Sequence, residues 1–333
     1  MCSRLVIKSR LSQFFAIGRL VSITSFLILT LLCGPRIMAQ ETAENAAAAS
    51  SEKPFPHPDA KNQNFAKAAL EFTPPAWPPT DIDTAEPALN PEAACSLPAV
   101  LQGASQHATE FSSDLDRFTA IEVIQSVEAK NSGAWDRVQT RTFDYMAVVT
   151  RPRAGVAYVD ESRVAKGRSE PPAIRTEGLA VTALIFHPEN INDFAMICEG
   201  MGEWHGKPSW RIRFAQKQDR PANFQVIHVE DKRFGVKLKG RAWIAADNYE
   251  IEHIDVDLLE PIPQIRLLTE HSSIDYGAVG FTNGSSHLWL PQQADFYLDI
   301  NGHRFFNRHQ LSNFLLFSVG VKQETEQPKL PKQ

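Results

Sequence analysis

Apolar and polar residues alternate along much of the C-terminal half of the chain. Between residues 210 and 214 apolar side chains alternate with arginines, and residues 294–300 repeat a similar arrangement. Strict alternation places one set of side chains on each face of a β-strand, so one face is apolar and the other is wet. The residues that we expect to face a ligand from the apolar side are Trp210, Ile212, Phe214, Phe296 and Leu298.

Short turns separate the alternating stretches. Tight two-residue β-turns require positive φ angles, which glycine, asparagine and aspartate tolerate best. Four such dipeptides lie between the stretches: His205-Gly206, Asp247-Asn248, Asn283-Gly284 and Asn301-Gly302. The spacing predicts an antiparallel sheet built largely from consecutive hairpins.

A helix is predicted before these strands. Residues 97–118 carry apolar side chains at spacings of three and four, behind Ser96 as a good N-cap and with Pro98 in the first turn. The opposite face carries glutamine and acidic residues, which favours packing on a sheet over binding to a membrane surface. Strands are expected at 119–127, 139–150 and 156–163, and the apolar stretch 178–186 is a short buried helix or a strand.

We therefore expect an α+β fold that is mainly antiparallel β: a curved sheet or half-barrel meander with the N-terminal amphipathic helix packed on its apolar face. A helix is ~10–12 Å across and neighbouring strands lie ~4.8 Å apart, so helix 97–118 covers only part of such a sheet. The stretch 178–186 is the other candidate cover. Either the sheet curls on itself, or it keeps an apolar cavity suited to an acyl chain or another lipophilic ligand.

Residues 1–39 have the composition of a signal peptide. Arg4, Lys8 and Arg10 precede the apolar stretch 20–32, and Ala39 provides a small residue before the cleavage site. The apolar stretch is shorter than the roughly 20 residues that span a bilayer. The sequence predicts export to a bacterial periplasm or to the extracellular space, with an uncleaved N-terminal anchor as the alternative.

The remaining chain divides by composition. Residues 40–94 are rich in proline and alanine without helical or strand period, which predicts a disordered linker. The alternative is that Phe72 and Trp77 dock on the folded domain. We expect a single β-rich domain at 95–322 and a disordered tail at 323–333.

Two cysteines, Cys95 and Cys198, remain after removal of the predicted signal peptide. An even pair in an oxidising compartment can form a disulfide. In the chain-entropy model a loop of about 100 residues makes such a bond worth up to ~4–5 kcal/mol. The sequence leaves this pairing and two free thiols equally open.

Charge and motifs argue against several classes of function. The formal net charge of −5 does not favour nucleic acid as a partner. The chain contains no G-x-S-x-G, Walker, H-E-x-x-H or C-x-x-C motif. Within predicted strands, His253, Asp255 and Asp257 share a face, and His303 and His309 lie ~20 Å apart. Since an acidic strand face is usually only solvated, we expect no metal, cofactor or catalytic residue and favour a non-enzyme.

A basic row is predicted on the wet face, formed by Arg211, Arg213, Lys237, Lys239 and Arg241. It could contact anionic lipid head groups or polysaccharide. Basic residues on an open sheet face more often protect edges and maintain solubility, and we favour that interpretation.

Several short segments resemble a group of uncharacterised secreted proteins of acidobacterial type. These are GRAWIAAD at 240–247, DYG at 275–277, LWLPQ at 288–292, FTAIE at 118–122 and IFHP at 185–188. The resemblance covers nearly the whole domain and implies no known activity. The order of elements, one helix and then a long meander, is also similar to the LolA/LolB-type lipoprotein carriers and receptors. That similarity implies a half-barrel that holds acyl chains under a helical lid, without assigning any residue a role.

Three functions stay open at this point. The first is an exported cell-envelope protein that binds or carries a lipophilic ligand, of acyl-chain or lipoprotein type, with at most peripheral membrane contact. The second is a structural or interaction protein of the envelope that binds another envelope protein. The third is a hydrolase with an unfamiliar site.

Overall fold

The computed structural model describes residues 5–9, 77, 79–84, 88–90, 92–129, 134–153, 156–167, 174–175, 178–222, 224–229, 232–280 and 287–318. The turn Asn283-Gly284, Phe72, the predicted cleavage site, most of the predicted linker and the predicted tail lie outside these residues.

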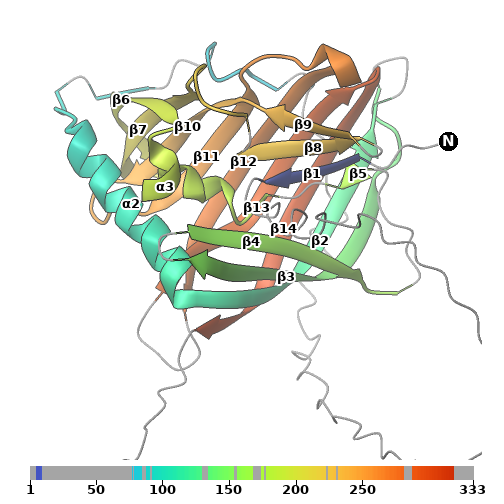
Figure 1. The fold of residues 1–333 in the computed structure, drawn as a ribbon, viewed down its shortest axis with the longest axis horizontal. Coiled ribbons are helices and arrows are strands. Elements are labelled where there is room, and N and C mark those ends of the chain that lie inside the picture. Colours follow the sequence, from blue (N-terminus) through green and yellow to red (C-terminus); the bar gives the residue numbers. More distant parts are fainter. Residues whose placement is uncertain are drawn as a thin grey trace, which may run out of the picture.

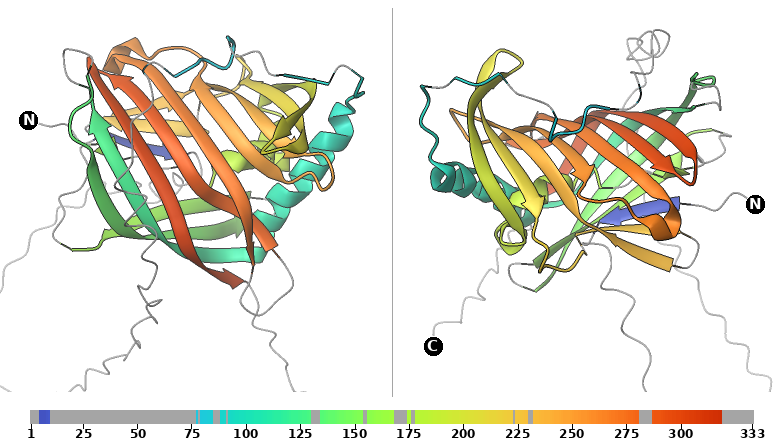
Figure 2. Two further views of the ribbon diagram at one scale, coloured as in Figure 1. Left: turned by 180° about the vertical axis from the view of Figure 1, so that it is seen from behind. Right: turned by 90° about the horizontal axis from the view of Figure 1, so that it is seen from above.

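Ten strands form one large antiparallel sheet in the order β4-β3-β2-β14-β13-β12-β11-β10-β7-β6 (Figure 1). The sheet is strongly curved, and among the described strands its edges β4 and β6 do not pair with each other (Figure 2). The fold is therefore mainly antiparallel β with a curved, unclosed sheet, as predicted. The strand bounds are β2 (Leu115–Glu128), β3 (Gln139–Arg153), β4 (Val156–Ala165), β6 (Phe194–Trp204), β7 (Lys207–Gln216), β10 (Leu238–Ala245), β11 (Ile251–Leu258), β12 (Leu267–Gly280), β13 (His287–Ile300) and β14 (His303–Ser318).

Tight turns join neighbouring strands at two of the predicted positions. His205 (φ 48°) and Gly206 (φ 76°) connect β6 to β7, and Asn301 (φ 53°) and Gly302 (φ 80°) connect β13 to β14. These positive φ angles are the reason why glycine and asparagine occur there. Asp247-Asn248 also lies in a turn, between β10 and β11.

Helices and a second sheet cover the concave face of the large sheet (Figure 1). The helical elements are α2 (Leu97–Asp114), η3 (Thr182–Phe186) and α3 (Pro188–Ile191); η4 (Pro263–Ile265) lies between β11 and β12. The second sheet has the order β5-β1-β8-β9, with β1 (Leu5–Ser9), β5 (Ile174–Arg175), β8 (Gln225–Val229) and β9 (Lys232–Val236). Ala104 of α2, Leu184 of η3, and Ile227 and Val236 of the second sheet all belong to the core on this face. Strand β1 comes from the predicted signal peptide.

The helix ends earlier than the sequence pattern predicts. Residues 97–118 were expected to be helical, but α2 ends at Asp114 and Leu115 begins β2 without a connecting loop. Leu115 and Phe118 continue the helical spacing, yet strand pairing places Phe118 opposite Ala147 and Leu316. Both residues are fully buried as strand residues, so pairing with β3 and β14 overrides the helical period. Ser96 occupies the N-cap position, but its side chain makes no capping hydrogen bond.

Residues from the end of the predicted linker lie on the convex face. The backbone N–H of Ile82 donates to Asp257 Oδ2 at 2.9 Å, and the Ile82 side chain is only 2% exposed. The Trp77 ring lies 5.8 Å from that of Tyr297 and 6.3 Å from that of Trp135. These contacts place the described part of residues 77–94 against the sheet, and we call it the convex strap.

Candidate functional site

The five residues expected to face a ligand lie on the concave side of two strands. Ile212 and Phe214 of β7 and Phe296 and Leu298 of β13 are buried in one core cluster, and the half-buried Trp210 packs against it. Strands β10, β11 and β12 lie between β7 and β13. The register across them places the β7 residues and the β13 residues in neighbouring rows of side chains on the sheet. The concave face is thus an apolar surface that extends over several strands.

Side chains from the cover fill the space over this surface. The Phe214 ring contacts those of Phe186 and Phe194 edge-on, with centroids 6.2 and 5.8 Å apart. Phe186 belongs to η3 and is fully buried. The apolar surface is therefore closed by the chain itself in this conformation.

A small pocket marks the seam between the cover and the sheet. Its volume is about 30 Å³, enough for roughly one water molecule, whereas ligand pockets usually measure ~300–1,000 Å³. Its wall contains Ala108 of α2, Ala183 of η3, Tyr276 of β12 and Leu288 of β13. At this seam α2, η3 and two sheet strands meet.

The rim of this pocket carries a polar contact that ties α2 to the sheet. His107 Nδ1 lies 3.1 Å from Glu110 Oε2 and 3.2 Å from Glu250 Oε1, and His107 Nε2 lies 2.8 Å from the carbonyl oxygen of Asn248. Burial raises the pKa of Glu250 to about 7, helped by Glu110 and opposed by His107. The contact joins the middle of α2 to the turn between β10 and β11.

A network of buried charges lies on the same concave side, at β2, β3, β4 and β14. Arg163 donates two hydrogen bonds to Glu122, from Nε at 2.5 Å and from Nη2 at 2.9 Å. His309 Nδ1 lies 2.7 Å from Glu122 Oε1, and both residues are fully buried. Burial opposes ionisation of Glu122, but Arg163 and His309 together lower its pKa to about 2. A buried carboxylate therefore stays charged here.

Two further groups extend this network toward the pocket. Glu161 Oε1 accepts the backbone N–H of Ala180 at 3.0 Å, and Ala180 is itself part of the pocket wall. Tyr145 lies between these groups and is fully buried, with the Arg163 guanidinium 5.0 Å from its ring centroid. Sequence reasoning missed the whole network, because its members alternate along strands like ordinary polar positions and only strand pairing brings them together.

The predicted basic row forms on the convex face, but acidic groups pair with most of it. Arg213 forms an ion pair with Asp83, and Lys239 contacts both Asp81 and Asp83 at 2.9 and 2.6 Å. Arg241 donates two hydrogen bonds to Glu199, and Lys237 binds Gln218. The Arg211 guanidinium lies 4.8 Å from the Trp243 ring centroid. The convex strap supplies the two aspartates, so this row is not an open cationic surface.

The histidines that invite a metal hypothesis have carboxylate partners. His253 stacks on Trp204 at 3.9 Å, with Nδ1 2.6 Å from Asp275 and Nε2 3.0 Å from Asp255. Burial opposes protonation, but the two aspartates raise the pKa of His253. Within the described residues no group of three His, Cys, Asp or Glu side chains is arranged to hold a metal ion. His303 contacts Glu128 and His309 contacts Glu122, so these two histidines belong to different sites.

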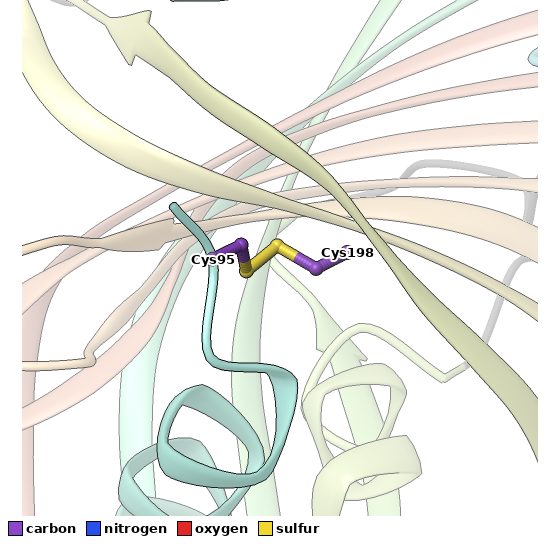
Figure 3. The surroundings of a disulfide bond; sticks show 2 residues. All are labelled: Cys95 and Cys198. Carbon is purple, nitrogen blue, oxygen red and sulfur yellow. A yellow bond between two sulfur atoms is a disulfide. The ribbon is translucent and has the colours of Figure 1, made fainter. Parts of the chain in front are cut away.

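Cys95 and Cys198 form a disulfide, with their Cα atoms 6.4 Å apart (Figure 3). Cys95 lies two residues before the start of α2, and Cys198 belongs to the edge strand β6. The bond therefore fixes the N-terminal end of α2 to one edge of the large sheet.

Comparison with known proteins gives similarity at the level of structure. No protein-family model matches the sequence, and no curated protein matches it. A DUF1329 family protein from Desulfovibrio piger is similar over 68% of this chain and 95% of its own, with 11% identity and a TM-score of 0.36. A putative outer membrane lipoprotein-sorting protein domain from Vibrio parahaemolyticus is similar over 67% and 94%, with 10% identity and a TM-score of 0.34.

A LolA superfamily protein from Nitrosomonas europaea covers 68% of this chain and 96% of its own length, with 13% identity and a TM-score of 0.31. In the described parts of the chain, no helix has the length and apolar character of a membrane span.

Proposed function

We propose that this protein is exported to the bacterial cell envelope and binds or carries a lipophilic ligand against the concave face of its large sheet. The observation that carries the proposal is the broad apolar surface of an unclosed sheet, which among the described residues is covered by α2, the η3–α3 segment and the small second sheet. Export is inferred from residues 1–39, whose composition is that of a signal peptide; cleavage after residue 39 would remove β1 and leave the β8–β9 hairpin of the second sheet in the cover. The resemblance to secreted acidobacterial proteins belongs to the same proposal.

Binding requires the cover to move. The present pocket of about 30 Å³ is too small for an acyl chain, so a ligand has to displace side chains that now fill the concave side. Helix α2 is fixed at one end by the disulfide and continues directly into β2 at the other. The η3–α3 segment has no disulfide among the described residues, and the seam that it shares with α2 is the expected point of access.

A substitution at the seam tests the proposal. Ala183 is half-buried in the pocket wall, and a tryptophan there would occupy the point of access without removing any core side chain. We expect the wild-type protein to bind the apolar dye N-phenyl-1-naphthylamine, and the Ala183→Trp variant to bind it at least tenfold more weakly in fluorescence titration. Ala195→Trp is the matched control, because Ala195 is exposed on β6 and should leave the affinity unchanged.

Two negative results together would contradict the proposal. If the wild-type protein binds no dye, and native mass spectrometry finds no copurified lipid, the carrier function is wrong. The filled concave side would then support the second candidate, a packed structural module of the envelope whose strapped convex face serves interaction.

A further inference from the structure

Two buried oxygen atoms on the concave side lack hydrogen bonds. Tyr145 Oη and Glu161 Oε2 have no hydrogen-bond partner among the described residues. Tyr145 is fully buried, and the Glu161 side chain is only 3% exposed. Buried polar groups are nearly always paired, because leaving them unpaired costs stability. These two atoms are therefore candidates for contact with a bound molecule.

Tyr145 and Glu161 are close enough for Glu161 to contribute to the raised pKa of Tyr145, but neither oxygen has a hydrogen bond of good geometry among the described residues. Arg163 Nη2 lies 3.8 Å from Glu161 Oε2, which is an ion-pair contact and too long for a hydrogen bond, because the guanidinium fork is directed at Glu122. The other oxygen of Glu161 already accepts the N–H of Ala180. What is left is one acceptor on Glu161 beside a phenol hydroxyl that can donate. A ligand hydroxyl complements both, since it donates one hydrogen bond and accepts another.

The surrounding charge disfavours an anionic head group. Two carboxyl groups, those of Glu122 and Glu161, face a single guanidinium, that of Arg163. His309 adds no firm positive charge, because burial lowers its pKa despite the opposing effect of Glu122. Burial raises the pKa of Glu161 although Arg163 opposes the shift, so this dry site disfavours negative charge, and the carboxylate of a fatty acid would meet the same desolvation cost. An uncharged alcohol meets no such penalty.

The pair lies directly behind the pocket wall. Ala180, which binds Glu161 through its N–H, is part of the wall, and so is Tyr276, whose hydroxyl lies 3.5 Å from the carbonyl oxygen of Leu179. A ligand that displaces the short turn at Leu179 and Ala180 would bring its polar end to Glu161 and Tyr145. Its chain would then run along the apolar concave surface.

We propose that Tyr145 and Glu161 bind the hydroxyl of an uncharged lipid alcohol, such as a long-chain alcohol or an acylglycerol, and discriminate against fatty-acid anions. This inference rests on the proposed function, because it names the polar end of the ligand that the concave face would hold.

The test compares two ligands of equal chain length. 1-Dodecanol and dodecanoate are titrated at pH 7.5 against protein loaded with N-phenyl-1-naphthylamine, and displacement of the dye gives both affinities. We expect the wild-type protein to prefer the alcohol at least tenfold. Tyr145→Phe and Glu161→Gln should each reduce that preference to less than threefold while the dye still binds. Tyr297→Phe removes a hydroxyl from a buried tyrosine on the convex face and should keep the full preference.

Every outcome of this titration either supports or contradicts the inference. Equal affinity for the two ligands in the wild-type protein, or an unchanged preference in both variants, would overturn the inference and leave a buried water as the partner of the two oxygens. In that case dye binding still supports the proposed function. If one variant does not fold by circular dichroism, the other supplies the same readout. Absence of dye binding in the wild-type protein contradicts the proposed function, and the inference falls with it.

Discussion

Glu270 is a carboxyl group that the fold buries without a cationic partner among the described residues. It lies on β12 opposite Leu298 and is 6% exposed. Gln225 of β8 donates one hydrogen bond to Oε1 at 2.5 Å, and Oε2 has no hydrogen-bond partner in the described structure. Burial raises the pKa of Glu270 to about 7, with Gln225 opposing the shift and Asp257 adding to it.

The variant Glu270→Gln should therefore stabilise the protein at alkaline pH. A pKa raised from 4.5 to about 7 means that the folded state is most stable below pH ~4.5 and loses stability as pH rises through ~7. The difference amounts to roughly 3 kcal/mol at pH 8 and above, since one pKa unit is ~1.4 kcal/mol. Urea unfolding between pH 5 and pH 9 should show the free energy of unfolding of the wild type falling by up to that amount relative to the variant.

Glu203→Gln is the control. Glu203 is exposed on β6, so this substitution makes the same chemical change at a position that is not buried. A parallel pH dependence in wild type and Glu270→Gln would show that Glu270 is ionised at little cost and would contradict the expectation.

For single residues, the sequence predicts which face of the sheet a side chain occupies better than it predicts which residue that side chain contacts. The alternation of Ile212 with Arg211 and Arg213 fixes which side chains point to the core. It does not show that Arg213 meets Asp83, 130 residues away, or that Arg163 meets Glu122 across strand β3. Such pairs depend on strand order and on the path of the strap, which short-range patterns do not encode.

Helix α2 approaches the sheet most closely at a glycine. A Cβ atom added at Gly103 would lie 2.4 Å from Cγ and 2.5 Å from Cβ of Tyr249. Because Tyr249 Cβ is one of these atoms, rotation of the Tyr249 side chain cannot relieve the clash. The helix can lie over this turn, and His107 can reach Asn248 and Glu250, only because position 103 has no side chain.

Gly103→Ala should destabilise the protein although alanine is the better helix former. In an exposed helix the exchange would stabilise by up to ~1 kcal/mol, but the clash with Tyr249 should cost about 1–3 kcal/mol and displace α2. Thermal or urea unfolding measures the net effect. Gln102→Ala, at an exposed position of the same helix, should change stability by less than ~0.5 kcal/mol. Increased stability in Gly103→Ala would mean that α2 does not pack on Tyr249.

Elements were predictable where their contacts are local. The hairpins at His205-Gly206 and Asn301-Gly302 follow from turn chemistry, and α2 follows from its spacing of apolar residues. The end of α2 at Asp114 did not follow, because Leu115 and Phe118 fit both periods. The second sheet was also missed: β8 and β9 are short, and β8 pairs with β1, a strand within the residues predicted as a signal peptide.

For the whole molecule, the disulfide is the longest-range covalent constraint in the described chain. Cys95 and Cys198 are separated by 103 positions. The double variant Cys95→Ser with Cys198→Ser should lower the free energy of unfolding by up to ~4–5 kcal/mol, as the chain-entropy model gives for a loop of this size. Urea unfolding of the variant should match that of the reduced wild-type protein. Equal stability with and without the bond would show that the unfolded chain is not appreciably constrained.

The sequence predicts the architecture as a whole, but it does not predict how completely side chains fill the concave side of the sheet. A curved sheet with one amphipathic helix on its apolar face follows from the strand pattern. Whether Phe186 and Phe194 fill the space over Phe214 depends on how the η3–α3 segment folds back, which no period in residues 178–191 specifies. Whether the concave side has room for a ligand therefore depends on the η3–α3 segment, whose conformation the sequence does not predict.

The disulfide also closes a covalent ring. The chain from Cys95 to Cys198 contains α2, strands β2 to β4 and the η3–α3 segment, so the helical part of the cover and three of the ten strands beneath it belong to one circle. While the ring is closed, the helix keeps both of its attachments, and under the proposed function a ligand leaves by a local shift at the seam. Once the ring is cut by reduction, the N-terminal end of α2 loses its covalent attachment to β6, and contacts such as that of His107 with Glu250 hold the helix to the sheet. Under the proposed carrier function, a ligand would therefore be released more readily in reducing than in oxidising surroundings.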